Sequence, residues 1–267
     1  MDDARVGELE HSAWSMFSFM GRAPGGRIVD TPTRLVIETP VARPPYNAVM
    51  RFYDEGDRPL PEQAKALLAP MIERDVTPIW LVHPTTDPAI RDTLAGLGLE
   101  CAEELYGMAA DLADVPPPDE VPDGVDVVEL TLDDSHTWLE LVSWRYGLGE
   151  ESSEYLIEAY RSSLDERTRV WVAIVDGQAV SKVGLHIDHL VNPGGVAGIY
   201  GVATTESGRG RGLARLLCAT ALGAARSAGI ERTVLHSTPM AHSLYRRMGY
   251  EDIATFEVWA APDTVHL

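Results

Sequence analysis

The chain has 267 residues, of which 45% are hydrophobic, and a formal net charge of −19. That length allows one large domain or two of ordinary size. The acidic balance argues against a nucleic-acid or anionic-membrane surface, because both need basic patches.

The first half of the chain carries few clear element signals. An apolar run predicts a strand over residues 78–82. Asp87-Pro88 then predicts the start of a helix that ends at Gly98. Prolines crowd residues 114–122, and proline fixes φ and removes amide donors, so we expect an extended linker there. We therefore predict one domain over residues 1–117, a linker over 118–124 and a second domain over 125–267.

The second half alternates between strands and helices. The strands are expected at residues 125–130, 170–175, 178–187, 195–204, 233–235 and 253–259. Asp176-Gly177 joins two of these strands as a strong hairpin turn. The helices are expected at residues 134–144, 152–163, 213–228 and 239–248, the last with Thr238 as N-cap and Gly249 after it. This order predicts a mixed antiparallel and parallel α/β sheet with flanking helices.

The first half also reads as a faded copy of the second, at an offset of 151 residues, although chance could produce such a match. The helix opened by Pro88 matches the helix opened by Pro239. The same offset pairs Arg58 with Arg209, Pro59 with Gly210, Pro61 with Gly212, Glu62 with Leu213 and Leu94 with Tyr245. Two prolines remove two amide donors and a carboxylate repels phosphate, so this copy would lack the site described next.

A glycine-rich turn separates the strand ending at Thr204 from the long helix that begins near Leu213. Such a turn directs free backbone amides and the positive end of the helix dipole at one spot. Gly210 and Gly212 lack Cβ atoms, so a phosphate could approach closely, and Arg209 and Arg211 add positive charge. The glycine spacing fits neither a Rossmann nor a P-loop motif. The turn predicts an anion site, with an exposed basic turn as the alternative.

Two motifs in this region carry a family resemblance. Arg209, Gly212 and Ala214 fill the pattern [Q/R]-x-x-G-x-[G/A] after a strand, and residues 241–250 fill A-x-x-[LF]-Y-x-x-x-G-[FY]. Over residues 125–260 the chain resembles the GNAT N-acetyltransferase superfamily. The first half resembles the degenerate N-terminal domain of tandem bacterial members.

The resemblance implies acetyl-CoA as co-substrate, without a metal. Val202 and Thr204 would bond the pantetheine arm, and the thioester would lie where the strands at 195–204 and 233–235 splay apart. Tyr245 would act as general acid toward the leaving thiolate. The pyrophosphate would be held by backbone amides of Arg209, Gly210, Arg211, Gly212, Leu213 and Ala214.

Other residues near this gap have several interpretations. His236 ends the short strand and is the best-placed histidine for a general base, although water could serve instead or the histidine could be structural. His186, Asp188 and His189 could bind a metal or an amine, or form a solvated loop. Glu206 is expected to be exposed. An aromatic-lined acceptor pocket is expected from the region of Trp138, Trp144, Tyr155, Tyr160 and Trp171.

The resulting hypothesis is transfer of acetyl from acetyl-CoA to a primary amine of a small molecule or peptide, by direct attack in a ternary complex. The alternative is a catalytically silent CoA-binding regulator or partner-binding scaffold. Two cysteines, Cys101 and Cys218, are too few for a disulfide framework and match no metal motif. The N-terminus is acidic and no segment is long and apolar enough to span a bilayer. We expect a cytoplasmic monomer that binds neither nucleic acid nor membrane.

Overall fold

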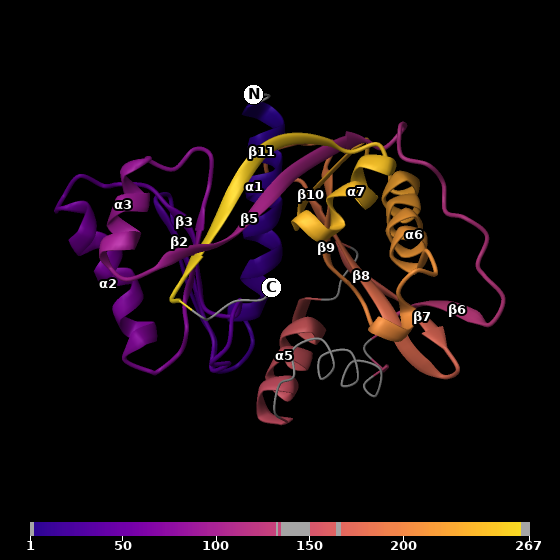
Figure 1. Ribbon diagram of the computed structural model, residues 1–267, viewed down its shortest axis with the longest axis horizontal. Coiled ribbons are helices and arrows are strands. Elements are labelled where there is room, and N and C mark those ends of the chain that lie inside the picture. Colours follow the sequence, from indigo (N-terminus) through magenta and orange to yellow (C-terminus); the bar gives the residue numbers. More distant parts are fainter. Residues whose placement is uncertain (1–2, 132, 135–149, 164–166, 263–267) are drawn as a thin grey trace.

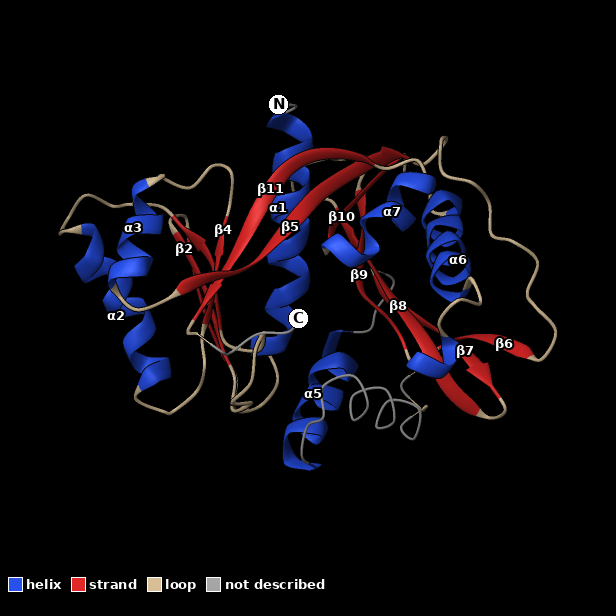
Figure 2. Ribbon diagram, in the orientation of Figure 1, coloured by secondary structure: helices blue, strands red, loops and turns tan. Residues whose placement is uncertain are grey.

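The computed structural model describes residues 3–131, 133–134, 150–163 and 167–262. Within them, eleven strands form one mixed sheet with the order β1-β2-β3-β4-β11-β5-β10-β9-β8-β7-β6. Helices cover both faces of this sheet (Figures 1 and 2). The predicted class, a mixed α/β sheet with flanking helices, is confirmed.

The first half supplies three α-helices, a short 3-10 helix and five strands. The helices are α1 (Asp3–Phe17), η1 (Ser18–Gly21), α2 (Leu60–Ile72) and α3 (Ala89–Gly96). The strands are β1 (Arg27–Thr31), β2 (Arg34–Glu38), β3 (Ala48–Phe52), β4 (Ile79–Val82) and β5 (Glu100–Asp111).

The second half supplies the remaining six strands. They are β6 (Val125–Glu129), β7 (Thr168–Val175), β8 (Gln178–Asp188), β9 (Val196–Thr204), β10 (Arg232–Ser237) and β11 (Glu251–Ala260). Its helices are α5 (Glu150–Ser163), η2 (Glu206–Gly208), α6 (Leu213–Ser227) and α7 (Pro239–Arg247). The helix expected over 134–144 lies almost wholly outside the described residues. Asp176 and Gly177 form the expected hairpin turn, with φ of 50° and 78°.

The two halves exchange their last strands. β5, from the first half, lies between β10 and β11 of the second half. β11 in turn lies between β4 and β5, so each half completes its sheet with a strand of the other. In Figure 1, β5 and β11 arch side by side from one half to the other. One continuous sheet is the result.

The pairing of β5 with β11 shows that the internal repeat is structural. Leu105 pairs with Phe256, and these residues are 151 positions apart. The same offset relates Ala109 to Ala260 and Glu251 to Glu100. Ala109 pairs with Glu251 and Ala260 pairs with Glu100, so the pairing is symmetric under the offset. A pseudo-twofold axis therefore passes close to Leu105 and Phe256.

Helix ends extend the repeat and refine its register. α3 and α7 are followed by Gly98 and Gly249, with φ of 88° and 94°. At the start of α2 and α6 the offset is two residues longer, because the N-caps are Pro59 and Gly212. Pro59 rather than Pro61 therefore occupies the position of Gly212.

Three buried clusters explain how the sheet is covered. Along β7, Val170 and Val172 belong to one cluster and Trp171 and Ala173 to another, as the alternation of side chains in a strand requires. The first cluster includes side chains of α1 and α5, whereas the second includes those of α6 and α7. The third packs α2 and α3 against the first half of the sheet.

The N-terminal helix therefore packs on the other half's strands. Leu9 and Ala13 of α1 share a cluster with Val196 of β9 and Val234 of β10. Since α1 and α6 cover opposite faces of β8, that strand is buried along nearly its whole length. None of the described helices is long and apolar enough to cross a bilayer.

Candidate functional site

The turn before α6 presents unpaired backbone amides. Gly210 and Gly212 both have φ of 75°, a conformation that glycine adopts without steric cost. At the start of the turn, the carbonyl oxygen of Thr205 accepts a hydrogen bond from the amide of Arg209 at 3.1 Å. The amides of Gly210, Arg211 and Gly212 make no hydrogen bond among the described residues. The first amides of α6 have no helical acceptor either, so the turn and the helix end form one donor surface.

A groove of about 840 Å³ lies over this surface. It is lined by β9, by the turn, and by the start of α6 and one side of α7. Arg209, Arg215 and Arg247 contribute cationic groups, and Glu206 is the acidic residue among the lining side chains. Arg211 is exposed and lies outside the lining set, and Arg215 also pairs with Asp119. The groove thus concentrates positive charge and amide donors in a chain of net charge −19.

A bulge in β9 brings backbone to the inner end of the groove. Ala203 pairs with Lys182 and Tyr200 with Gly184, so two residues, Gly201 and Val202, stand opposite one on β8. Gly201 has φ of 57°. The bulge breaks the regular hydrogen-bonding ladder beside Val202, which lines the groove.

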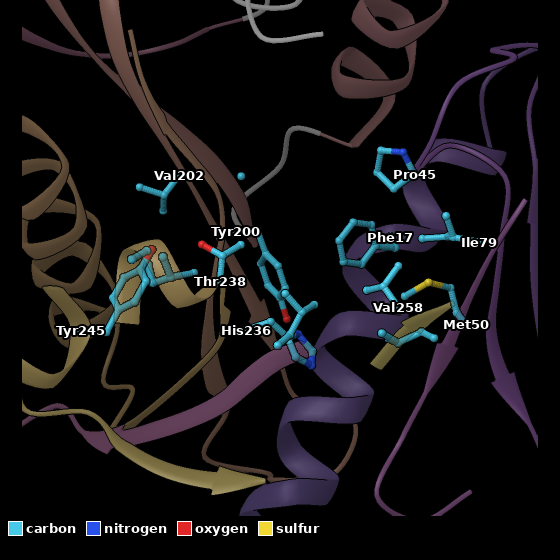
Figure 3. Close-up of a pocket in the computed structure, with 15 residues that line it drawn as sticks. Phe17, Pro45, Met50, Ile79, Tyr200, Val202, His236, Thr238, Tyr245 and Val258 are labelled. Carbon is cyan, nitrogen blue, oxygen red and sulfur yellow. The ribbon is translucent and has the colours of Figure 1, made fainter. Parts of the chain in front are cut away.

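Strands β9 and β10 separate at the same level. Their parallel pairing ends at Ile199 and Leu235, as expected for splayed strands. Beyond that point an inner pocket of about 220 Å³ opens between the halves. It shares Val202, Thr238, Ala241 and Tyr245 with the groove, so the two spaces are adjoining. In Figure 3, Tyr245, Thr238 and Val202 lie on one side, and Phe17, Pro45 and Met50 on the other.

Tyr245 stands at the junction of groove and pocket. It is only 4% exposed, and its ring lies 5.8 Å from that of Tyr250 in an edge-to-face arrangement. Burial, with smaller contributions from Cys218 and Tyr250, raises the pKa of Tyr245 well above its ordinary value. The phenol is therefore a proton donor throughout the physiological pH range.

His236 points its ring into the inner pocket from β10, beside Tyr200 (Figure 3). Its Nε2 atom is buried and has no hydrogen-bond partner among the described residues. Phe256 lies against the ring, with centroids 4.3 Å apart. Burial, and secondarily the nearby His83, lowers the pKa of His236 to about 3. The imidazole is neutral at physiological pH and is a weak base.

Comparison with known proteins agrees with this geometry. Residues 126–253 match the model of the acetyltransferase (GNAT) domain family. Over this range, which includes the groove and Tyr245, the chain is similar to the GNAT acetyltransferases. No curated protein sequence matches the chain.

Solved structures resemble the whole chain at low sequence identity. A GCN5-related N-acetyltransferase from Kribbella flavida is 16% identical with a TM-score of 0.63, covering 96% of this chain and 95% of its own. A tandem GNAT protein from the clavulanic acid biosynthesis pathway is 16% identical with a TM-score of 0.62, covering 97% and 95%. A GCN5-related N-acetyltransferase from Sphaerobacter thermophilus is 18% identical with a TM-score of 0.57, covering 90% and 84%. These likenesses extend the GNAT fold across both halves.

Of the cluster His186, Asp188 and His189, the first two residues are buried, whereas a solvated loop would expose them. His186 is buried on β8 and makes two hydrogen bonds, to Thr168 at 2.8 Å and to Ser15 at 2.9 Å. Asp188 is also buried and accepts from the amide of Leu190. No group of three metal-ligating side chains occurs in the described part of the GNAT fold. His186 therefore ties β7 and β8 to α1.

The aromatic residues singled out in the sequence lie away from the inner pocket where they are described. Tyr155 donates to the carbonyl oxygen of Met20 at 2.5 Å, and Tyr160 packs on Phe19 with centroids 4.9 Å apart. Trp171 is buried on the face that α6 covers. Trp138 and Trp144 lie outside the described residues. Cys218 is buried in the α6 core, and Glu206 is exposed as expected.

Several residues of the inner pocket had no signal in the sequence. Phe17, Met50, Ile79 and Leu81 come from the first half and sit in ordinary apolar patterns. Tyr200 of β9 is another such residue, and its hydroxyl is 2.6 Å from that of Ser12 on α1. These side chains reach the inner pocket because the first half packs against the second.

Proposed function

We propose that the protein transfers an acetyl group from acetyl-CoA to a primary amine, by direct attack within a ternary complex. The observation that carries this proposal is the array of unpaired amides at the start of α6, which faces a groove ending beside Tyr245. Anions bind at such helix starts because free N–H groups and the helix dipole act together. The amides of Gly210, Arg211, Gly212, Leu213 and Ala214 would hold the pyrophosphate there, and Arg209 would contribute its side chain, because its amide already donates to the carbonyl oxygen of Thr205.

The pantetheine arm would follow β9. Val202 and Thr204 line the groove, and the bulge at Gly201 frees backbone groups that a pantetheine amide or thioester carbonyl could bond. The thioester would then lie at the splay of β9 and β10. Backbone donors near Val202 would polarise its carbonyl as negative charge develops on oxygen.

Tyr245 is proposed as the general acid. The amine nitrogen forms a bond to the acetyl carbon, the carbon–sulfur bond breaks, and the phenol gives its proton to the sulfur. The raised pKa of Tyr245 supports this role because it keeps the hydroxyl protonated until the thiolate appears.

His236 is proposed to act on the acceptor amine. His236 lines the inner pocket, and its buried Nε2 atom has no partner among the described residues, so a small rotation of the ring would let that atom accept a hydrogen bond from the nucleophile. With a pKa of about 3 the ring orients the nitrogen more effectively than it removes a proton from an ammonium ion. Water would then take the proton lost by the amine.

The first half is proposed to be the partner domain without a cofactor site of its own. Pro59 occupies the N-cap of α2 and Pro61 the second position of that helix, so two amide donors are missing where the second half has them. The proposed division is residues 1–117 and 125–267. Because the halves already pair with each other through β5 and β11, we propose a monomer as the working unit.

Thiol release from acetyl-CoA against a panel of amines tests this function. We expect amine-dependent release, a kcat lowered about 100-fold or more in Tyr245→Phe, and unchanged CoA affinity in that variant, in line with the usual contribution of general acid catalysis. Tight CoA binding without release for any amine would instead support a silent CoA-binding regulator. An unchanged kcat in Tyr245→Phe would remove the tyrosine from the mechanism.

A further inference from the structure

The inner pocket has an unusual chemical character for a site that receives an amine. Among the residues that the structure describes, its lining contains no Asp, Glu, Lys or Arg side chain. Ten of the lining side chains are apolar, namely Phe17, Pro45, Met50, Ile79, Leu81, Leu105, Ile199, Val202, Ala241 and Val258. An ammonium ion moved into such surroundings would lose its hydration without gaining a counter-charge.

The internal symmetry explains how the pocket acquired one polar and one apolar wall. Leu81 of β4 pairs with Val258, and His236 of β10 pairs with Gly107. Gly107 and Val258 are related by the offset of 151, so Leu81 is the first-half counterpart of His236.

The neighbouring strands give the second pair of counterparts. Ala48 of β3 pairs with Ile79, and Gly198 of β9 pairs with Val234. Two residues further along, Met50 is the counterpart of Tyr200. The faded half has thus placed Met50 and Leu81 where the second half has a phenol and an imidazole.

We infer that this pocket holds the apolar body of the acceptor, which is a small amine uncharged when it binds, such as an aromatic amine. This inference rests on the proposed function and names its substrate class. The first half supplies the selecting wall, with Met50 and Leu81 facing the acceptor's hydrocarbon. Tyr200 and His236 face its nitrogen from the other wall, next to Tyr245.

The electrostatics of the polar wall agree with an uncharged occupant. His236 is neutral, and the hydroxyl of Tyr200 is occupied by Ser12 at 2.6 Å. Neither group offers the negative charge that would hold an ammonium ion. The net charge of −19 attracts cations to the surface in general, whereas the pocket itself selects against them.

The size of the pocket agrees with this class. A cavity of roughly 150 Å³ is enough to bind benzene, so the pocket of about 220 Å³ has room for an aromatic amine such as aniline. An aromatic amine of this size is uncharged at neutral pH, so its nitrogen needs no base before attack. That matches a pocket whose titratable histidine is a weak base.

The test compares aniline with putrescine, a dication of similar size, using acetyl-CoA and the full-length protein. We expect kcat/KM to favour aniline at least tenfold. Met50→Trp should remove most of this preference, and Met50→Ala or Leu81→Ala should shift the preference by about tenfold toward 4-butylaniline. A gain for the larger amine cannot arise from misfolding. Ile72→Ala, on the exposed side of α2, is the matched control and should leave the ranking unchanged.

Calorimetry with CoA-saturated protein separates this inference from the proposed function. Aniline binding that Met50→Trp abolishes, without turnover, would support the pocket assignment and contradict the transferase proposal. Turnover of putrescine at a rate equal to that of aniline, insensitive to Met50 and Leu81, would overturn the assignment. So would a preference for hexanoyl-CoA over acetyl-CoA that only Met50→Trp removes, because the pocket would then hold the acyl chain.

Discussion

The exchange of β5 and β11 predicts that the second half cannot fold alone as a monomer. Deleting residues 1–117 removes β5, which pairs with β10 at six positions and with β11 at nine. It also uncovers Val196, Tyr200 and Val234, which α1 buries. Full burial of one such side chain contributes about 1.5–3 kcal/mol, so these three contribute about 5–9 kcal/mol. That is most of the 5–15 kcal/mol by which a typical domain is stable.

Thermal unfolding followed by circular dichroism, with sedimentation to fix the oligomeric state, checks this expectation. Residues 118–267 should show no cooperative transition as a monomer, and co-expression with residues 1–117 should restore it. A dimer would agree with the reasoning, because a second copy can supply the missing strand. A monomer that unfolds cooperatively within about 5 °C of the full chain would refute it, since β11 would then pair directly with β10.

Two further predictions concern the groove and the inner pocket. Gly212→Trp should weaken CoA binding about 100-fold or more, because tryptophan would have to adopt a left-handed backbone conformation and would block at least two amide donors, each worth about 1.5–3 kcal/mol to a charged group. Pro59→Ala and Pro61→Ala should leave the Kd for CoA unchanged. Calorimetry that finds the same Kd for all three variants would contradict a single cofactor site. Stability should fall as the pH drops from about 6.5 toward 3, because the depressed pKa of His236 means that the unfolded chain binds its proton first. Denaturant titrations of His236→Asn should show a smaller loss of unfolding free energy over that pH range. His11→Asn serves as a comparison, because burial also lowers the pKa of His11. Equal pH dependence of the unfolding free energy in wild type and His236→Asn would show that the imidazole is not buried in solution.

Turns and helix ends could be predicted from the sequence because they depend on residues that are neighbours in the chain. The glycines at 210 and 212, the hairpin at Asp176-Gly177 and the proline start of α7 all depend on short-range backbone geometry. The apolar spacing of α6 likewise determined its buried face, including Cys218. For the same reason the sequence located the turn, Tyr245 and His236, and it detected the repeat through the glycines that end α3 and α7.

The tertiary structure decided what no local pattern encodes. Strand exchange depends on which edges meet in space, and β5 and β11 have the same apolar pattern whether they pair within or between halves. The packing of the two halves brings Phe17, Met50 and Leu81 opposite Tyr200 and His236. It also buries His236, which changes a histidine that the sequence suggests as a base into a neutral group of low pKa. The sequence by itself predicted the glycine-rich turn before α6, which depends on neighbours in the chain. Only the packing of one half against the other determined the pocket beside that turn, because residues far apart in the chain make the pocket.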